Sequence, residues 1–233
     1  MISQKYNLWY AINQPMITPT VENYLKSLFL LDPQGKKRVA TGALASSLGV
    51  TPGSATSMIK SLAESNFVVH RPHYGVQLTQ EGRRLAIHVV RRHRIVELFL
   101  VQILGMDWSR VHDEAEKLEH VVSIEVVDRL DALLGHPSVD PHGDPIPTAN
   151  GELLHRPLAQ LASCNEGDSV SVARIVNQDT AFLQFAEESG LLLGATITVI
   201  SKNDIADSIT LQSEEKEVIL GLAAAGRIEV EHV

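Results

Sequence analysis

The segment from residue 41 to residue 62, TGALASSLGVTPGSATSMIKSL, constrains the fold most, because it predicts two short helices joined by a tight turn. Thr41 can cap the first helix, and Gly49 suits the left-handed position at which a helix ends. Thr51 can cap the second helix, with Pro52 in its first turn, where the missing N–H costs nothing. The apolar residues have the spacing of a helix-turn-helix core: Leu44, Ala45, Leu48, Val50, Ala55, Ile59 and Leu62.

The outward face of the second helix carries short hydroxyl side chains and one cation, which suit base edges and phosphates in a major groove. These residues are Ser54, Thr56, Ser57 and Lys60. Residues 67–79 predict two short strands around a tip that bears Arg71, as in the wing of a winged helix. The alternative is a polar helix surface without a ligand, since helix-turn-helix spacing also occurs in proteins that bind no DNA. The predicted wing favours DNA binding.

The charges divide the chain into a basic part and an acidic part. Residues 1–94 contain 12 Lys and Arg against 4 Asp and Glu, whereas residues 95–233 contain 8 against 24. A basic module attracts the phosphate backbone of DNA, and an acidic one attracts cations. No apolar run approaches the roughly 18 residues that cross a membrane. The single cysteine, Cys164, fits a reducing compartment. We therefore expect a cytoplasmic protein that binds double-stranded DNA and no membrane.

Residues 112–120, HDEAEKLEH, predict a helix with metal-ligand side chains on one stripe. Within an arc of roughly 100° lie His112, Glu116, Glu119 and His120. Imidazole and carboxylate groups suit Mn²⁺ or Fe²⁺. His93 and Glu97 form a second pair, spaced i,i+4 on the preceding predicted helix. The alternative is a solvated, salt-bridged helix edge, which is common on charge-rich helices. The second pair favours the metal interpretation.

The remaining pattern predicts a mostly α-helical chain with a C-terminal β domain. A helix over 20–31 precedes the helix-turn-helix. Thr79, Ser109 and Ser123 are expected to cap three further helices, whose apolar surface favours dimerisation. A helix over 179–189 interrupts five short strands that follow residue 167, as in a small SH3-like barrel. We expect a winged helix over 1–78, a helical metal-binding and dimerisation domain over 79–150, and an SH3-like domain over 151–233.

The chain resembles the bacterial metal-dependent repressors typified by the diphtheria toxin repressor and the manganese transport regulators. Three motifs carry the resemblance, which extends over nearly the whole chain from about Thr20. They are Arg92-His93-Arg94, the paired stretches VHDEA (111–115) and LEHV (118–121), and HPSVDPHGDPIP (136–147). The resemblance implies a homodimer that binds Mn²⁺ or Fe²⁺ and then represses metal-uptake genes at palindromic operators.

The resemblance also implies two sets of metal ligands. One set would be His93, Glu97 and His112. The other would be Glu116, Glu119, His120 and a residue of the first helix. Glu116 is the manganese-type choice, because iron-type relatives have Cys at that position and carboxylate suits Mn²⁺. At the first-helix position, Asn23 departs from the Met or Asp of the family. Asp179 lies near the place where the SH3-like domain supplies an acidic ligand.

Two other functions are compatible with such a ligand set. Carboxylate and histidine helices also build the centres of di-metal enzymes. However, no nucleophile or general base stands apart from the predicted ligands, and a winged helix would have no role in an enzyme. A metal-buffering protein that binds no DNA is the other alternative. We expect a DNA-binding regulator and not an enzyme.

Overall fold

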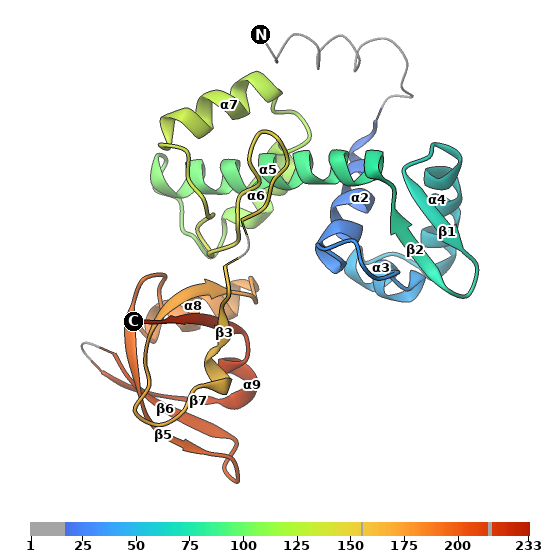
Figure 1. Cartoon of the computed structure of the whole chain (residues 1–233). Helices are drawn as coiled ribbons and strands as arrows, with labels where there is room; N and C mark the ends of the chain where they lie inside the picture. The colour runs from blue at the N-terminus through green and yellow to red at the C-terminus, as the bar shows by residue number, and fades with distance from the viewer. Residues whose placement is uncertain (1–16, 155, 214–215) are drawn as a thin grey trace. The chain divides into compact units, whose positions relative to one another are not determined.

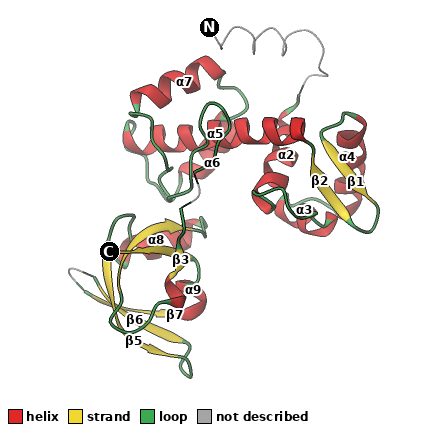
Figure 2. Cartoon of the chain, in the orientation of Figure 1, coloured by secondary structure: helices red, strands yellow, loops and turns green. Residues whose placement is uncertain are grey.

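The computed structural model of the protein describes residues 17–154, 156–213 and 216–233 (Figures 1 and 2). The first 16 residues of the predicted 1–78 domain lie outside this range. The chain forms two compact units, Met1–Val90 and Arg91–Val233, and the long helix α5 (Gln80–Gln102) begins in the first unit and continues into the second.

The first unit is a winged helix-turn-helix. Its helices are α2 (Pro19–Leu31), α3 (Thr41–Ser47) and α4 (Pro52–Glu64), followed by the antiparallel pair β1 (Val68–Arg71) and β2 (Gly75–Leu78). Of the predicted core, Leu48 and Val50 are half-buried. The other five residues are buried, namely Leu44, Ala45, Ala55, Ile59 and Leu62. Gly49 has the expected positive φ of 63°.

Of the two helix caps predicted in the helix-turn-helix, one is confirmed and one is wrong. Thr51 caps α4 as expected, because its hydroxyl oxygen accepts a hydrogen bond from the amide of Ser54 at 3.1 Å. The prediction that Thr41 caps α3 is wrong, because Ala40 occupies the cap position without a side-chain hydrogen bond. The cause is Val39, whose amide and carbonyl both pair with Val76 of the wing, so the chain can turn into a helix only after residue 40.

The second unit begins with the second half of α5, against which α6 (Val111–Leu118) and α7 (Ile124–Leu133) pack. Thr79 and Ser123 cap α5 and α7 as predicted. Ser109 does not cap α6, because its hydroxyl donates to the Asp107 carboxylate at 2.7 Å and Arg110 occupies the cap position. The ligand helix is also shorter than predicted, since α6 ends at Leu118 and the last two ligand residues lie in the turn that follows.

The rest of this unit is a small antiparallel β domain of SH3-like type. Its strands are β3 (Ala159–Gln160), β4 (Ser169–Ile175), β5 (Thr196–Asn203), β6 (Ser208–Gln212), β7 (Glu217–Gly221) and β8 (Ile228–His232), in the order β3-β8-β4-β5-β6-β7. The helices α8 (Thr180–Glu188) and α9 (Leu222–Ala225), with a 3₁₀ turn at Leu161–Ser163, pack on its apolar core. The fold class is therefore as predicted.

Among the described residues, none of the helices combines the length and the hydropathy that crossing a membrane requires.

Candidate metal centre

The packing of α5 against α6 brings the predicted ligands of both helices together. Val96 and Leu100 of α5 share one apolar cluster with Val111 and Ala115 of α6. The polar edge beside this cluster carries His93, Glu97 and His112. One carboxylate oxygen of Glu97, Oε1, lies 2.9 Å from His93 Nε2 and 3.0 Å from His112 Nδ1.

Glu116, Glu119 and His120 extend this network. Glu119 is fully buried, and its two oxygens lie 2.6 Å from His93 Nδ1 and 3.3 Å from His120 Nε2. Glu116 Oε1 lies 3.6 Å from His112 Nε2 and 3.9 Å from His93 Nδ1. The six ligands predicted on α5, on α6 and in the turn after α6 are therefore linked by one continuous network of contacts.

His93, His112 and Glu116 form what we call the first cluster, because each offers a ligand atom within 4.8 Å of the others. His93 is buried, whereas 41% of the His112 side chain and 34% of the Glu116 side chain are exposed. Two imidazoles and a carboxylate at this separation suit a divalent cation that is reached from solvent.

Glu97, Asp140 and His142 form the second cluster, with ligand atoms again within 4.8 Å of one another. All three are buried. Within the described parts of the chain, Glu97 Oε2 and His142 Nδ1 are buried without a hydrogen-bond partner. Buried acceptors normally have a donor, so two unpaired ones among three ligand-type residues fit a bound cation.

Asp140 and His142 were not predicted as ligands. Both lie in the proline-rich loop 136–147, which has no periodicity to reveal which side chains point inward. The sequence feature that could have indicated these ligands is the Asp-Pro-His-Gly motif that ends at Gly143. That glycine has a φ of 88°, and a Cβ there would lie 2.2 Å from the carbonyl oxygen of Ala173, so only glycine lets the loop approach β4.

The pKa values of the two buried carboxyls of the second cluster are shifted in opposite directions. Burial raises the pKa of Glu97, but the charge of His93 and hydrogen bonds from His112 and His93 outweigh burial, and the pKa lies below its ordinary value. Burial raises the pKa of Asp140 well above its ordinary value, and the carboxylates of Asp144 and Glu97 raise it further. The charged form is therefore favoured for Glu97 and disfavoured for Asp140.

Binding of Mn²⁺ at the second cluster is expected to release a proton from Asp140. A carboxyl with a raised pKa keeps its proton at a pH where an exposed aspartate has lost it, so affinity should rise as the pH increases through that pKa and weaken below it. Calorimetric titrations at several pH values, in buffers of different ionisation enthalpy, measure the release. Asp140→Asn should release about one proton fewer than the parent at the acidic end. Equal release by both proteins would contradict the prediction.

Charged side chains hold this loop against its neighbours. Arg94 lies 3.6 Å from Asp140 Oδ2 and 3.4 Å from Asp144 Oδ1. Asp144 also pairs with Arg174 of β4 and accepts a hydrogen bond from Gln178 at 2.7 Å. The loop is thereby tied both to α5 and to the β domain.

Four predicted ligands lie in neither cluster. Two of them, Glu119 and His120, join the first cluster through the contact of Glu119 with His93, whereas Asp179 and Asn23 do not. Asp179 is an exposed residue directly before α8 and belongs to neither cluster of the described residues, whereas the side chain of the preceding Gln178 donates to Asp144. Asn23 lies on α2 in the first unit. Its Oδ1 is buried without a hydrogen-bond partner among the described residues.

The predicted DNA-contacting residues lie on the accessible face of α4 and at the wing. Ser54, Ser57, Lys60 and Arg71 are exposed, and Thr56 is half-buried. Thr56 and Ser57 donate their hydroxyl hydrogens to the carbonyls of Pro52 and Gly53, at 2.8 and 3.1 Å. Their oxygens therefore remain available as hydrogen-bond acceptors.

Comparison with known proteins assigns each part of the chain. Residues 16–76 match the iron dependent repressor N-terminal DNA binding domain, and residues 79–148 match the iron dependent repressor metal binding and dimerisation domain. Residues 159–232 match the FeoA domain. The diphtheria toxin repressor of Corynebacterium diphtheriae is 32% identical over 222 residues, which cover 91% of this chain and 98% of that protein. The chain belongs to the diphtheria toxin repressor family.

Solved structures agree with this assignment. A manganese-dependent transcriptional repressor in complex with manganese is 40% identical with a TM-score of 0.84, covering 91% of this chain and 100% of that one. ScaR with bound Cd²⁺ is 34% identical with a TM-score of 0.76, covering 91% and 99%. Members of the family are metal-dependent transcriptional repressors and not enzymes, so the predicted regulator is confirmed and the enzyme alternative has no support.

Proposed function

We propose that this repressor is activated by Mn²⁺ and binds palindromic operators of metal-uptake genes in the cytoplasm. The proposal of Mn²⁺ rests on the ligand atoms, because both clusters offer only imidazole nitrogens and carboxylate oxygens. The single cysteine is buried in the core of the β domain, so it supplies no thiolate to either cluster. Hard oxygen ligands favour Mn²⁺, and Fe²⁺ is the other metal compatible with this set.

The proposed mechanism follows from the four carboxylates that share this small volume. Without a cation, the negative charges of Glu97, Glu116 and Glu119 repel one another, and burial disfavours the charged form of Asp140. A divalent ion would remove that repulsion and fix the positions of α5, α6 and the 136–147 loop. The helix α5 begins directly after the wing and carries His93 and Glu97. Fixing these two residues would therefore restrict the same continuous helix that leads to the DNA-binding unit.

A homodimer is supported by apolar side chains that the single chain leaves in solvent. In the turn directly after α5 and on α7, the exposed fractions are 50% for Ile103, 58% for Leu104 and 62% for Leu133. Exposed apolar surface of this kind is usually covered by a second copy. The proposed domain boundaries, 1–78, 79–150 and 151–233, place this surface in the middle domain.

Lys60→Ala is expected to weaken DNA binding for every sequence tested and to reduce the salt slope by about 0.9. Lys60 is exposed on the readout helix, where its charge can neutralise one phosphate and release one counterion. The measurement is affinity as a function of salt concentration. Lys117→Ala removes the same charge from α6, where Lys117 pairs with Glu114 at 2.7 Å, and serves as the control. An unchanged salt slope for Lys60→Ala would remove Lys60 from the interface.

The function is tested by repeated selection of binding sites from random duplex DNA in the presence of Mn²⁺. The expected result is enrichment of a palindrome with two half-sites, because a symmetric dimer presents two identical readout helices. Enrichment of no sequence, or equal enrichment with chelator present, would contradict the proposal.

A further inference from the structure

Trp108, in the connection between α5 and α6, contacts the second cluster through its backbone. Its carbonyl oxygen accepts a hydrogen bond from His142 Nε2 at 2.9 Å. A carbonyl can only accept, so Nε2 carries the ring hydrogen, and neutral His142 has its lone pair on Nδ1. Nδ1 is one of the buried atoms that lack a hydrogen-bond partner in the described structure. This single contact thus selects the tautomer whose free nitrogen can bind a metal.

The indole of Trp108 joins the same histidine to the β domain. It stacks on the His142 ring with centroids 5.6 Å apart and planes inclined by 28°. Its Nε1–H donates to Glu187 Oε2 of α8 at 3.1 Å, and the ring packs against the core of the β domain. Glu187, Trp108 and His142 therefore form a continuous connection from α8 to the second cluster.

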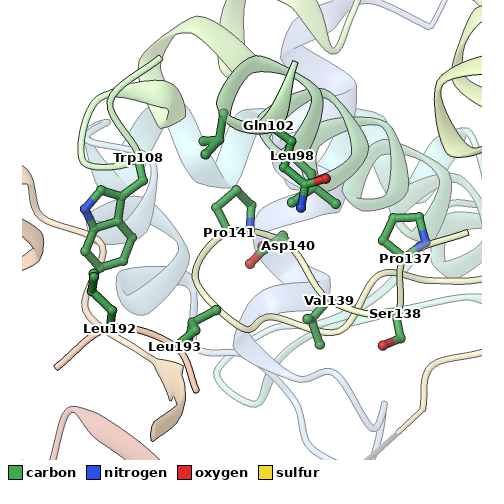
Figure 3. A pocket seen from close by; sticks show the side chains of 11 residues that line it. Leu98, Gln102, Trp108, Pro137, Ser138, Val139, Asp140, Pro141, Leu192 and Leu193 are labelled. Carbon is green, nitrogen blue, oxygen red and sulfur yellow. The ribbon is translucent and has the colours of Figure 1, made fainter. Parts of the chain in front are cut away.

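On another side, part of the loop that carries Asp140 and His142 borders an open space. A cavity of about 450 Å³ lies between it and the end of α5 (Figure 3). Trp108, Leu192, Leu193, Asp140 and Pro141 are among the residues that line it. Because this space is open, the loop owes its position to contacts elsewhere. The backbone of His142 is held by Asp140 and Ile175, whereas Trp108 contacts its imidazole ring through the stack and the hydrogen bond.

We propose that Trp108 is a positioning residue for the second metal site, which sets the tautomer and orientation of His142 and is itself held by Glu187 of the FeoA domain. The inference rests on the proposed function, because it requires the second cluster to bind a metal. It assigns the β domain a part in metal binding without making it a source of ligands. Groups that orient a metal-binding histidine typically change metal affinity by about 10–100-fold when they are removed.

Four variants of the full-length chain separate this role from simple packing. Trp108→Ala removes both the stack and the hydrogen bond to Glu187. Trp108→Phe keeps an aromatic ring over His142 but has no Nε1–H. Glu187→Ala removes the acceptor alone. Glu188→Ala is the matched control, because it removes the same charge from the neighbouring exposed position of α8.

Titration with Mn²⁺ alone, followed by calorimetry and electron paramagnetic resonance, gives the affinity of each site. Trp108→Ala should weaken the second site by about 10–100-fold and leave the first within about twofold. Trp108→Phe and Glu187→Ala should weaken it by smaller and similar factors, and Glu188→Ala should match the parent. If Trp108→Ala does not fold, Glu187→Ala carries the test, since Glu187 is exposed.

The tautomer of His142 is the readout that packing alone would not change. Nitrogen NMR of the metal-free protein should show only the Nε2–H form in the parent and in Glu188→Ala, and a mixture of tautomers in Trp108→Ala. That variant keeps the backbone carbonyl of residue 108, but without the stacked ring the carbonyl is no longer held against His142 Nε2. Unchanged second-site affinity in the folded variants, or weakened affinity with the tautomer preserved, would overturn the proposal. A parent that binds fewer than two Mn²⁺ ions would instead contradict the proposed metal sites, and the metal-free NMR comparison would still decide whether Trp108 controls His142.

Discussion

Glu97→Gln should weaken Mn²⁺ binding at both clusters by about 100-fold or more, the upper end of the effect of losing an outer contact to a metal ligand. Glu97 belongs to the second cluster and also contacts two residues of the first. Its Oε1 contacts His93 and His112, and its Oε2 is buried without a donor among the described residues. Glutamine has nearly the same shape, but it removes the negative charge and places an N–H₂ group where one oxygen was. The fold should persist while the affinity falls.

Titrations of the parent and the variant with Mn²⁺ measure this effect at each site. Glu114→Gln is the matched control, because it makes the same change on α6 in a half-buried residue that belongs to neither cluster and pairs with Lys117. It should titrate like the parent. A Glu97→Gln protein that binds Mn²⁺ at either site with the affinity of the parent would show that the Glu97 carboxylate is not a ligand there.

Glu116→Cys is expected to reverse the order of the metals to which the protein responds. Glu116 contributes the half-exposed carboxylate of the first cluster, 3.6 Å from His112. A thiolate in its place favours softer and later metals, so the response to Mn²⁺ should weaken and that to Fe²⁺, Co²⁺ or Zn²⁺ should strengthen, each by roughly tenfold. Operator binding against the free concentration of each metal gives the order.

Glu114→Cys tests whether the new thiol acts through its position. It introduces the same group on the same helix at a residue that belongs to neither cluster. Its order of metal responses should match that of the parent. If Glu116→Cys also keeps the order of the parent, Glu116 does not determine metal selectivity, and the assignment of manganese loses its main support.

The parts of the structure that were predicted correctly are those in which one local pattern decides the outcome. Gly49, Thr51 and Pro52 each fix the backbone by their own chemistry, so the helix-turn-helix follows from residues that are adjacent in sequence. The ligands on α5 and α6 are also visible in the sequence, because a helix places residues four apart on one face. His93 and His112 then meet as soon as the two helices pack through their apolar sides.

The parts that were missed depend on contacts between distant residues. Asp140 and His142 reach Glu97 from a loop more than forty positions away, and no local pattern indicates which of its side chains turns inward. Ser109 has the chemistry of a helix cap, but Asp107 competes for its hydroxyl. The strand β3 and the helix α9 have two and four residues, which is too short to show a period.

The central claim is that metal at these clusters controls DNA affinity. The most direct measurement is fluorescence anisotropy of full-length protein with the selected operator, with Mn²⁺ and with chelator. We predict that affinity is at least about tenfold higher with Mn²⁺, a coupling of about 1.4 kcal/mol or more, and that Glu97→Gln loses most of the difference. Equal affinity of the parent protein in the two conditions would contradict the account.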